Sequence, residues 1–140
     1  MAQESVMDKK NNVLVVNGDG TVTDTSTGLV WQQETTGPMT WKEALSYCKS
    51  LSLGGHDDWR MPGIKELISI IDYGRRNPAI DTTAFPDTLS SHYWSATTYT
   101  DYASSAWCVN FKHGGVYDLY ESYTYYVRAV RGGQSGVLDN

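Results

Sequence analysis

The chain lacks the features that mark membrane-spanning and disulfide-stapled proteins. Its 140 residues include only two cysteines, Cys48 and Cys108, which are too few for a disulfide scaffold but enough for one bridge. No apolar run approaches the roughly 18–20 residues that a membrane-spanning helix needs, so we expect no membrane insertion. The opening segment, MAQESVMDKKNN, also lacks the hydrophobic core of a signal peptide. Three possibilities stay open: a cytosolic chain, a trimmed piece, or a protein exported or assembled by other means.

Positive charge is also scarce. The chain has 11 Lys and Arg residues against 16 Asp and Glu, which gives a net charge of −5. Binding to a phosphate backbone needs clustered basic residues, and no basic run is present, so we expect no nucleic-acid partner. The length fits one domain with a sizeable core. We expect a flexible N-terminal tail at 1–11, a single domain at 12–133 and a C-terminal tail at 134–140.

The first third of the chain predicts a short β-meander. Residues 13–16, 21–24 and 29–32 are rich in β-branched residues, and turn-forming Gly, Asp and Ser residues lie between them. Asp19 and Asp24 are candidates either for turn formation or for calcium binding. The EF-hand spacing with its distal Glu is absent, so turn formation is favoured.

Two helices follow. Thr40 and Glu43 have the spacing of a capping box, and an apolar stripe begins directly after Thr40. This first helix is expected to end at Gly54–Gly55. A second helix is expected from Pro62 to Gly74. The two stripes consist of Trp41, Ala44, Leu45, Cys48 and Leu51 in the first helix, and of Ile64, Leu67, Ile68 and Ile71 in the second.

The link between the helices could hold a metal. His56, Asp57 and Asp58 are adjacent, but further ligands would have to come from elsewhere in the chain. We favour the alternative that one Asp caps the second helix or its turn while Arg60 pairs with the other. Cys48 lies on the apolar stripe. We therefore expect it to act as a small, buried hydrophobic side chain and not as a reactive thiol.

The C-terminal half predicts strands. We expect them at 107–112, 116–121 and 125–131, after an irregular connector at 75–92 that Ile80 and Phe85 anchor to the core. Trp107, Val109 and Phe111 should form the buried face of the first strand. In the last strand, Val127, Ala129 and Arg131 should share one face, and Arg128 and Val130 the other. Two helices before a block of strands indicate an α+β fold.

Tyrosine is concentrated near the carboxyl end. Eight of the ten tyrosines lie between Tyr93 and Gly132. Tyrosine provides a rigid, amphipathic contact area, which is typical of binding surfaces, although it also favours strands. We therefore predict a ligand-binding face and no catalytic residues. Its candidate residues are Tyr99, Asp101, Tyr102, Asn110, Lys112, Tyr117, Tyr120, Glu121 and Tyr123.

Several segments carry a family resemblance. NGDGTVTDTSTGLVWQ, WKEALSYCKSLSLGGHDDWRMP, IKELISIIDY, NPAIDTTAFP, YWSATTY and YYVRAVRGG together resemble the Legionella collagen-like adhesin C-terminal domain family, from about residue 13 to residue 133. That family is similar to the C-type-lectin-like superfamily. The resemblance implies two helices, a small mixed and mostly antiparallel sheet, a loop-rich C-terminal half, and a C-terminal strand beside the N-terminal one.

The resemblance also implies a function. The resemblance implies adhesion to a glycan or protein target. It also implies an extracellular or surface-displayed position, on a cell or a phage. It further implies homo-oligomers, with trimers in the adhesin case. The superfamily's calcium-dependent sugar sites carry EPN-, QPD- or WND-like motifs, and this chain has none. We therefore expect no metal and no cofactor.

Some positions depart from the family pattern. Ala129 stands where the family commonly has the cysteine partner of the residue matched by Cys48, so that bridge is missing. Cys108 stands where tyrosine is usual, and Tyr120 and Tyr123 stand where short polar residues are common. Single adenine changes produce Tyr-to-Cys and Asn-to-Tyr substitutions. The resemblance therefore suggests a variable protein of a diversity-generating retroelement.

Two rival functions remain. The chain could be a structural or trimerisation tip of a fibre or surface protein, with its tyrosines in a subunit interface. It could also resemble the superfamily's formylglycine-generating oxidases, with Cys48 and Cys108 as the reactive pair. The sequence shows no nucleophile–base arrangement or His-rich metal motif to support chemistry, so we expect no enzyme activity.

Overall fold

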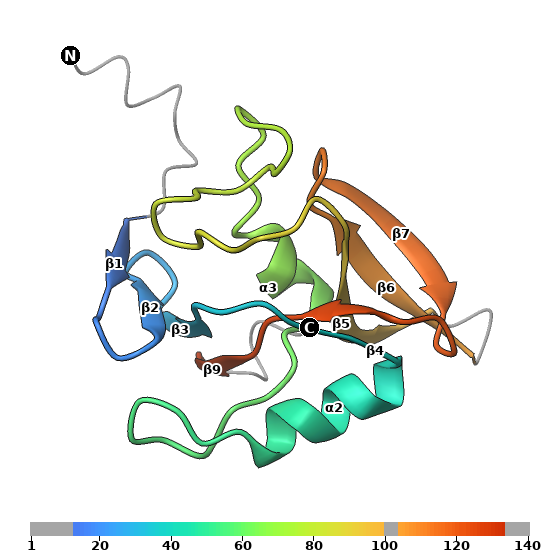
Figure 1. Ribbon diagram of the computed structural model, residues 1–140, viewed down its shortest axis with the longest axis horizontal. Coiled ribbons are helices and arrows are strands. Elements are labelled where there is room, and N and C mark those ends of the chain that lie inside the picture. Colours follow the sequence, from blue (N-terminus) through green and yellow to red (C-terminus); the bar gives the residue numbers. More distant parts are fainter. Residues whose placement is uncertain (1–12, 100–103, 134–140) are drawn as a thin grey trace.

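The computed structural model describes residues 13–99 and 104–133. The predicted tails at 1–11 and 134–140, and the candidates Asp101 and Tyr102, lie outside this range. The described chain forms two sheets and two helices, so the predicted α+β class is confirmed (Figure 1). The C-type-lectin-like assignment within that class stays a prediction. No helix in the described residues is long and apolar enough to cross a membrane.

The first sheet has four strands, in the order β1-β2-β3-β9. Its meander is the predicted one, with β1 at Leu14–Val16, β2 at Thr21–Asp24 and β3 at Leu29–Gln32. Asp19 accepts hydrogen bonds from the Thr21 backbone N–H and hydroxyl, at 3.2 and 2.6 Å. Asp24 accepts equivalent bonds from Ser26, at 2.9 and 2.7 Å. Both carboxylates therefore form turns, as predicted.

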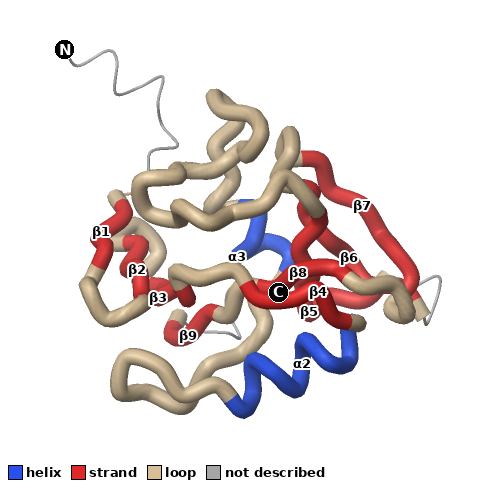
Figure 2. The backbone as a smooth tube through the Cα atoms, viewed as in Figure 1, coloured by secondary structure: helices blue, strands red, loops and turns tan. Residues whose placement is uncertain are grey.

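The second sheet has five strands, in the order β4-β8-β5-β6-β7. They are β4 (Thr36–Met39), β5 (His92–Thr98), β6 (Ser105–Asn110), β7 (Gly115–Tyr120) and β8 (Tyr125–Val127). β4 was not predicted, and the segment of β5 was not predicted as a strand. Much of the chain between the second helix and β5 is loop, which Figure 2 shows in tan.

The last predicted strand is two strands in different sheets. The chain leaves the second sheet after β8 and joins the first as β9 (Val130–Gly132), antiparallel to β3. Residues 127–130 are all buried, so the predicted alternation of faces is wrong. These residues are buried because the chain passes here from the second sheet to the first. The Ala129 N–H donates to the Gln32 side chain, and the Arg128 guanidinium donates to the Gln32 and Gln33 carbonyls.

Helix α2 (Trp41–Ser50) has the predicted capping box. The Glu43 N–H donates to the Thr40 hydroxyl at 3.3 Å, and the Thr40 N–H donates to the Glu43 carboxylate at 2.9 Å. The helix ends before Gly54–Gly55 because Leu51 is already extended. Helix α3 (Ile64–Ile68) is much shorter than predicted, and Gly63 rather than Pro62 precedes it.

The predicted ion pairing between the helices is wrong. Arg60 donates two hydrogen bonds of 2.8 Å to the buried carboxylate of Glu66. Asp58 instead pairs with Arg131 on β9. Glu66 also accepts from the Gly63 N–H, so it is Glu66, and neither Asp57 nor Asp58, that caps α3. Within the described residues, no three His, Cys, Asp or Glu side chains group as a metal site.

Hydrophobic clusters cover both faces of the five-stranded sheet. Tyr93 and Val109 face one cluster, which includes Leu67 of α3, Ile80 and Phe85. The connector residues Ile80 and Phe85 are thus buried, as predicted. The neighbouring residues Trp94 and Cys108 face the other cluster, which includes Ala44 and Cys48 of α2. β6 is therefore buried on both faces and not half-buried, because each face carries its own helix.

Candidate functional site

Three exposed tyrosines lie on β7 and in the turn that leads from it towards β8. Tyr117, Tyr120 and Tyr123 expose 40, 54 and 45% of their surface. β7 is an edge strand of its sheet, so nothing in the described chain pairs with its outer side. The structure thus places three of the predicted binding residues on one edge of the molecule.

Ring contacts join these tyrosines into a continuous row. His92 contacts Tyr117 and Tyr125 at centroid distances of 5.5 and 4.8 Å. Tyr123 contacts Tyr125 at 6.2 Å and Tyr120 at 5.5 Å. We call the five side chains His92, Tyr117, Tyr120, Tyr123 and Tyr125 the aromatic ridge. His92 and Tyr125 were not predicted site residues.

The ridge is anchored to the core through Tyr125. Its ring packs edge-on against the fully buried Trp94, at 5.5 Å and 66°. Trp94 in turn donates its indole N–H to the Met39 carbonyl on β4 at 3.0 Å. Such edge-to-face contacts add about 0.5–1.5 kcal/mol beyond simple burial. The half-buried Tyr125 therefore ties the exposed rings to a rigid base.

Backbone hydrogen bonds hold the turn that carries the ridge. The Tyr123 N–H donates to the Tyr120 carbonyl at 3.0 Å. The Glu121 N–H donates to the Ser104 carbonyl at 2.8 Å, and the Trp41 N–H donates to the Glu121 carbonyl at 3.1 Å. The predicted site residue Glu121 thus links the turn to the first residue of α2. These bonds fix the backbone that carries the Tyr120 and Tyr123 rings.

At its other end the ridge depends on a glycine. A Cβ atom at Gly115 would approach both the Tyr117 hydroxyl and the His113 ring to 2.8 Å. With glycine there, the Tyr117 ring lies between two histidines: its hydroxyl is 3.4 Å from His113 Nε2, and its ring contacts His92. His92 and His113 thus both contact the same tyrosine ring.

The remaining predicted residues in the described range are not part of the aromatic ridge. Asn110 accepts a hydrogen bond from the Lys112 N–H at 2.9 Å, so its side chain shapes the β6–β7 turn. Lys112 is exposed at that turn. Tyr99 is half-buried and packs edge-on against Trp107 at 5.2 Å. Among the other clustered tyrosines, Tyr93 is fully buried, and its hydroxyl bonds to the Thr35 hydroxyl.

A shallow hollow of about 230 Å³ adjoins the outer end of the ridge. Ser105, Asp118, Leu119, Tyr120 and Tyr123 line it. It combines two phenol rings with one carboxylate, which accepts hydrogen bonds. A ring or hydroxyl-bearing group could stack on a tyrosine there while donating to Asp118.

The two half-buried members of the ridge, His92 and Tyr125, are uncharged near neutral pH. Burial, and then the nearby charge of His113, lowers the pKa of His92, so the imidazole is neutral at pH 7. Burial, followed by the proximity of Cys108 and Tyr123, raises the pKa of Tyr125, so its phenol keeps its proton. Contacts with the ridge would therefore rest on aromatic surface and neutral hydroxyls.

Neither cysteine offers a reactive thiol. Both are free and fully buried in the cluster beneath α2. Burial raises the pKa of Cys48 to about 12. Burial, and to a lesser extent Asp118, raises the pKa of Cys108 to about 12. Since the thiolate is the nucleophile, these environments disfavour chemistry at sulfur. The buried state of Cys48 agrees with the prediction from its helical stripe.

Comparison with known proteins identifies one family. The sequence pattern of the Lcl C-terminal domain matches residues 20–131, from the turn before β2 into β9. No protein with a curated description matches the chain. The matched range contains the whole aromatic ridge and both helices.

Proposed function

Because the chain belongs to the Lcl C-terminal domain family, we propose that it is an adhesion or recognition module whose aromatic ridge binds a glycan or protein target. The family suggests a surface-associated, adhesin-like protein. We place this module outside the cell or on a cell or phage surface. The observation that carries the proposal is the exposure of Tyr117, Tyr120 and Tyr123 in one connected row.

The energetics of recognition support this choice. Binding energy in interfaces concentrates in a few aromatic or Arg side chains, and tyrosine loses little conformational entropy when it is immobilised. Here the turn and the neighbouring rings already restrict Tyr120 and Tyr123 before any ligand arrives. Preorganisation of this kind reduces the cost of ordering side chains on binding.

We propose a non-catalytic role. The ridge contains no arrangement of nucleophile and base, and the raised pKa values of the two thiols argue against an oxidase that uses them. The proposed contacts need neither a metal nor a cofactor. Hydroxyl groups of a glycan, or polar groups of a protein, would bond to the phenols and to Asp118 in the adjoining hollow.

Diversification by a retroelement receives support at only some positions. Tyr120 and Tyr123, which depart from the family pattern, are exposed on the ridge, where variation would alter binding. Cys108 departs as well, but it is fully buried and contributes nothing to the exposed face. The hypothesis therefore concerns the turn after β7. A coding locus without a reverse transcriptase and a matching template repeat would count against it.

The test is an array of glycans and surface proteins probed with the wild type and a Tyr120→Ala/Tyr123→Ala double variant. We expect the double variant to lose binding while its melting temperature stays nearly unchanged. Tyr73→Ala is the matched control, because Tyr73 is 63% exposed and lies outside the ridge. Undiminished binding by the double variant would refute the ridge as the contact surface, and a loss of fold would assign the two rings a structural role.

One observation favours a second function. No strand of the described chain pairs with the outer side of β7, and its exposed aromatic side chains would also suit contact with another subunit. In a trimeric tip domain, the same tyrosines would be buried between copies of the chain. Size-exclusion chromatography with light scattering separates the cases: the double tyrosine variant would change a trimer to a monomer, whereas a monomeric binder would keep its mass.

A further inference from the structure

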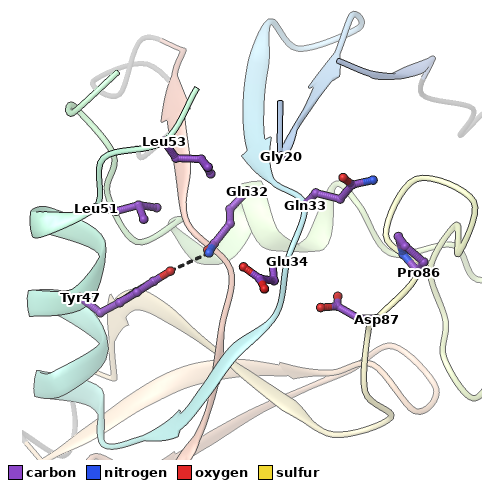
Figure 3. Close-up of a pocket in the computed structure, with 9 residues that line it drawn as sticks. All are labelled: Gly20, Gln32, Gln33, Glu34, Tyr47, Leu51, Leu53, Pro86 and Asp87. Carbon is purple, nitrogen blue, oxygen red and sulfur yellow. Dashed lines mark hydrogen bonds between the residues drawn. The ribbon is translucent and has the colours of Figure 1, made fainter. Parts of the chain in front are cut away.

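A second pocket lies away from the aromatic ridge and shares no residue with it. Its volume is about 350 Å³, which is within the size range of small-ligand sites. Four parts of the chain meet around it: the turn before β2, the end of β3, the end of α2 with the segment after it, and the loop at 86–87. Figure 3 shows the nine residues that line it: Gly20, Gln32, Gln33, Glu34, Tyr47, Leu51, Leu53, Pro86 and Asp87.

One side of the pocket is apolar. Leu51 and Leu53 are half-buried and pack against the core cluster beneath α2. Between this side and the carboxylates lies Gln32, which is 1% exposed. Its amide nitrogen donates to the Tyr47 and Thr36 hydroxyls, at 2.7 and 3.2 Å, and its oxygen accepts from a backbone N–H at 3.0 Å. Gln32 is thus satisfied within the protein and holds the shape of the pocket.

The opposite side carries negative charge. Glu34 is exposed and has no hydrogen-bond or ion-pair partner in the described part of the chain. Asp87 accepts from the Thr35 N–H at 3.2 and 3.0 Å, which orients its carboxylate and leaves further acceptor capacity. Both carboxylates extend into the pocket in Figure 3. No lysine, arginine or histidine from the described residues lines it.

One cation, Arg128, lies close enough to Asp87 for their charges to interact. Arg128 lies behind the β3 end of the pocket and is 1% exposed. Its guanidinium donates to the Gln32 and Gln33 carbonyls and to the Thr35 and Thr88 hydroxyls. It does not pair directly with Glu34 or Asp87 through any described bond. The two carboxylates therefore present unfilled acceptor positions opposite an apolar wall.

We propose that this pocket binds an alkylammonium group, with its aliphatic stem against Leu51 and Leu53 and its ammonium head between Glu34 and Asp87. An ammonium group supplies three donors to acceptor-rich surroundings, and a four-carbon stem covers apolar surface. The same chemistry occurs in a lysine side chain of a protein partner and in a free amine. This site is independent of the ridge, so either proposal can fail alone.

The test is a titration of the ¹⁵N-labelled full chain followed by NMR. Nα-acetyl-lysine methylamide represents a lysine in a polypeptide, and n-butylamine represents a free amine. Nα-acetyl-norleucine methylamide has the same kind of stem without the charge. We expect saturable shifts around Glu34 and Leu53 with the charged probes only, weakened by added salt. A stronger response to the lysine probe identifies a polypeptide source, and an equal or stronger response to butylamine identifies a free amine.

Matched variants locate the interaction. Glu34→Gln should weaken binding of the lysine probe by about tenfold or more, equivalent to about 1.4 kcal/mol. Asp57→Asn removes an exposed carboxylate outside the pocket and should leave binding unchanged. Equal shifts with the norleucine probe, or unaltered binding by Glu34→Gln, would overturn the proposal. Localised shifts with calcium chloride but not with either amine would overturn it in favour of a metal site.

Discussion

Replacing Arg128 with methionine should destabilise the fold more than almost any other single change near the chain crossing. Arg128 is 1% exposed, and its guanidinium donates four hydrogen bonds to two carbonyls and two hydroxyls. It also lies over the Phe85 ring, 4.5 Å from its centroid. Methionine fills a similar volume but donates to none of these acceptors.

The magnitude follows from the groups left without a partner. A buried acceptor that loses its hydrogen bond costs about 1–3 kcal/mol, and the Gln32 and Gln33 carbonyls would both lose the guanidinium. Removing a buried charge recovers part of its desolvation cost. We therefore expect the free energy of unfolding to fall by about 3 kcal/mol in total. For the described part of the chain, about 120 residues, the unfolding entropy is about 0.25 kcal/mol/K, so the melting temperature should fall by about 12 °C.

The assay is urea and thermal unfolding followed by tryptophan fluorescence and circular dichroism. Arg128→Lys should fall between the wild type and Arg128→Met, because an ammonium keeps the charge but lacks the planar fork. Arg75→Met is the control. Arg75 forms an exposed pair with Asp72, and its loss should cost less than about 1 kcal/mol. An Arg128→Met variant as stable as the wild type would contradict this reasoning. It would show that the desolvation cost of the buried guanidinium equals the stabilisation from its hydrogen bonds.

Three further predictions concern the helix cap, the thiols and the ridge histidine. Thr40→Ala should lower the free energy of unfolding by about 1 kcal/mol, whereas Thr40→Ser should retain the capping bond; denaturant titration checks both. Cys48 and Cys108, with pKa values of about 12, should react with a thiol reagent at pH 8 only after unfolding; rapid labelling of the native protein would contradict their burial. The pKa of His92 is lower in the folded state than in the unfolded chain. As the pH falls, His92 is therefore protonated at a higher pH in the unfolded chain than in the folded protein, so the free energy of unfolding should fall below about pH 6.5. A His92→Gln variant should lose part of that dependence in unfolding measurements made between pH 7.5 and pH 5.

Local signals predicted the first half of the fold well. The strands of the meander and the start of α2 depend on residues close in sequence, such as the turn aspartates and the Thr40–Glu43 cap. The end of α2 and the length of α3 were wrong because tertiary contacts determine them. The segment after α3 continues instead through backbone bonds such as Asp72 N–H to the Ala79 carbonyl.

The C-terminal half was harder to predict because its pairings are non-local. The division of the last strand depends on contacts between Arg128 and carbonyls about a hundred residues earlier, and a charged residue in a strand pattern gives no sign of them. The tyrosine cluster correctly indicated exposed aromatic side chains at positions 117, 120 and 123. It did not indicate that Tyr93 is buried or that His92 joins the row, since both follow from the register of β5 with its neighbours.

The turn after β7 has a consequence for how this protein can change over time. The bonds from Glu121 to Ser104 and from Trp41 to Glu121 are made by main-chain atoms, which every amino acid except proline provides in full. Positions 120, 122 and 123 can therefore exchange their side chains without removing any of those bonds. Substitution at this turn can therefore change the exposed side chains while the path of the backbone is retained; under the proposed function, this would alter which partner is bound.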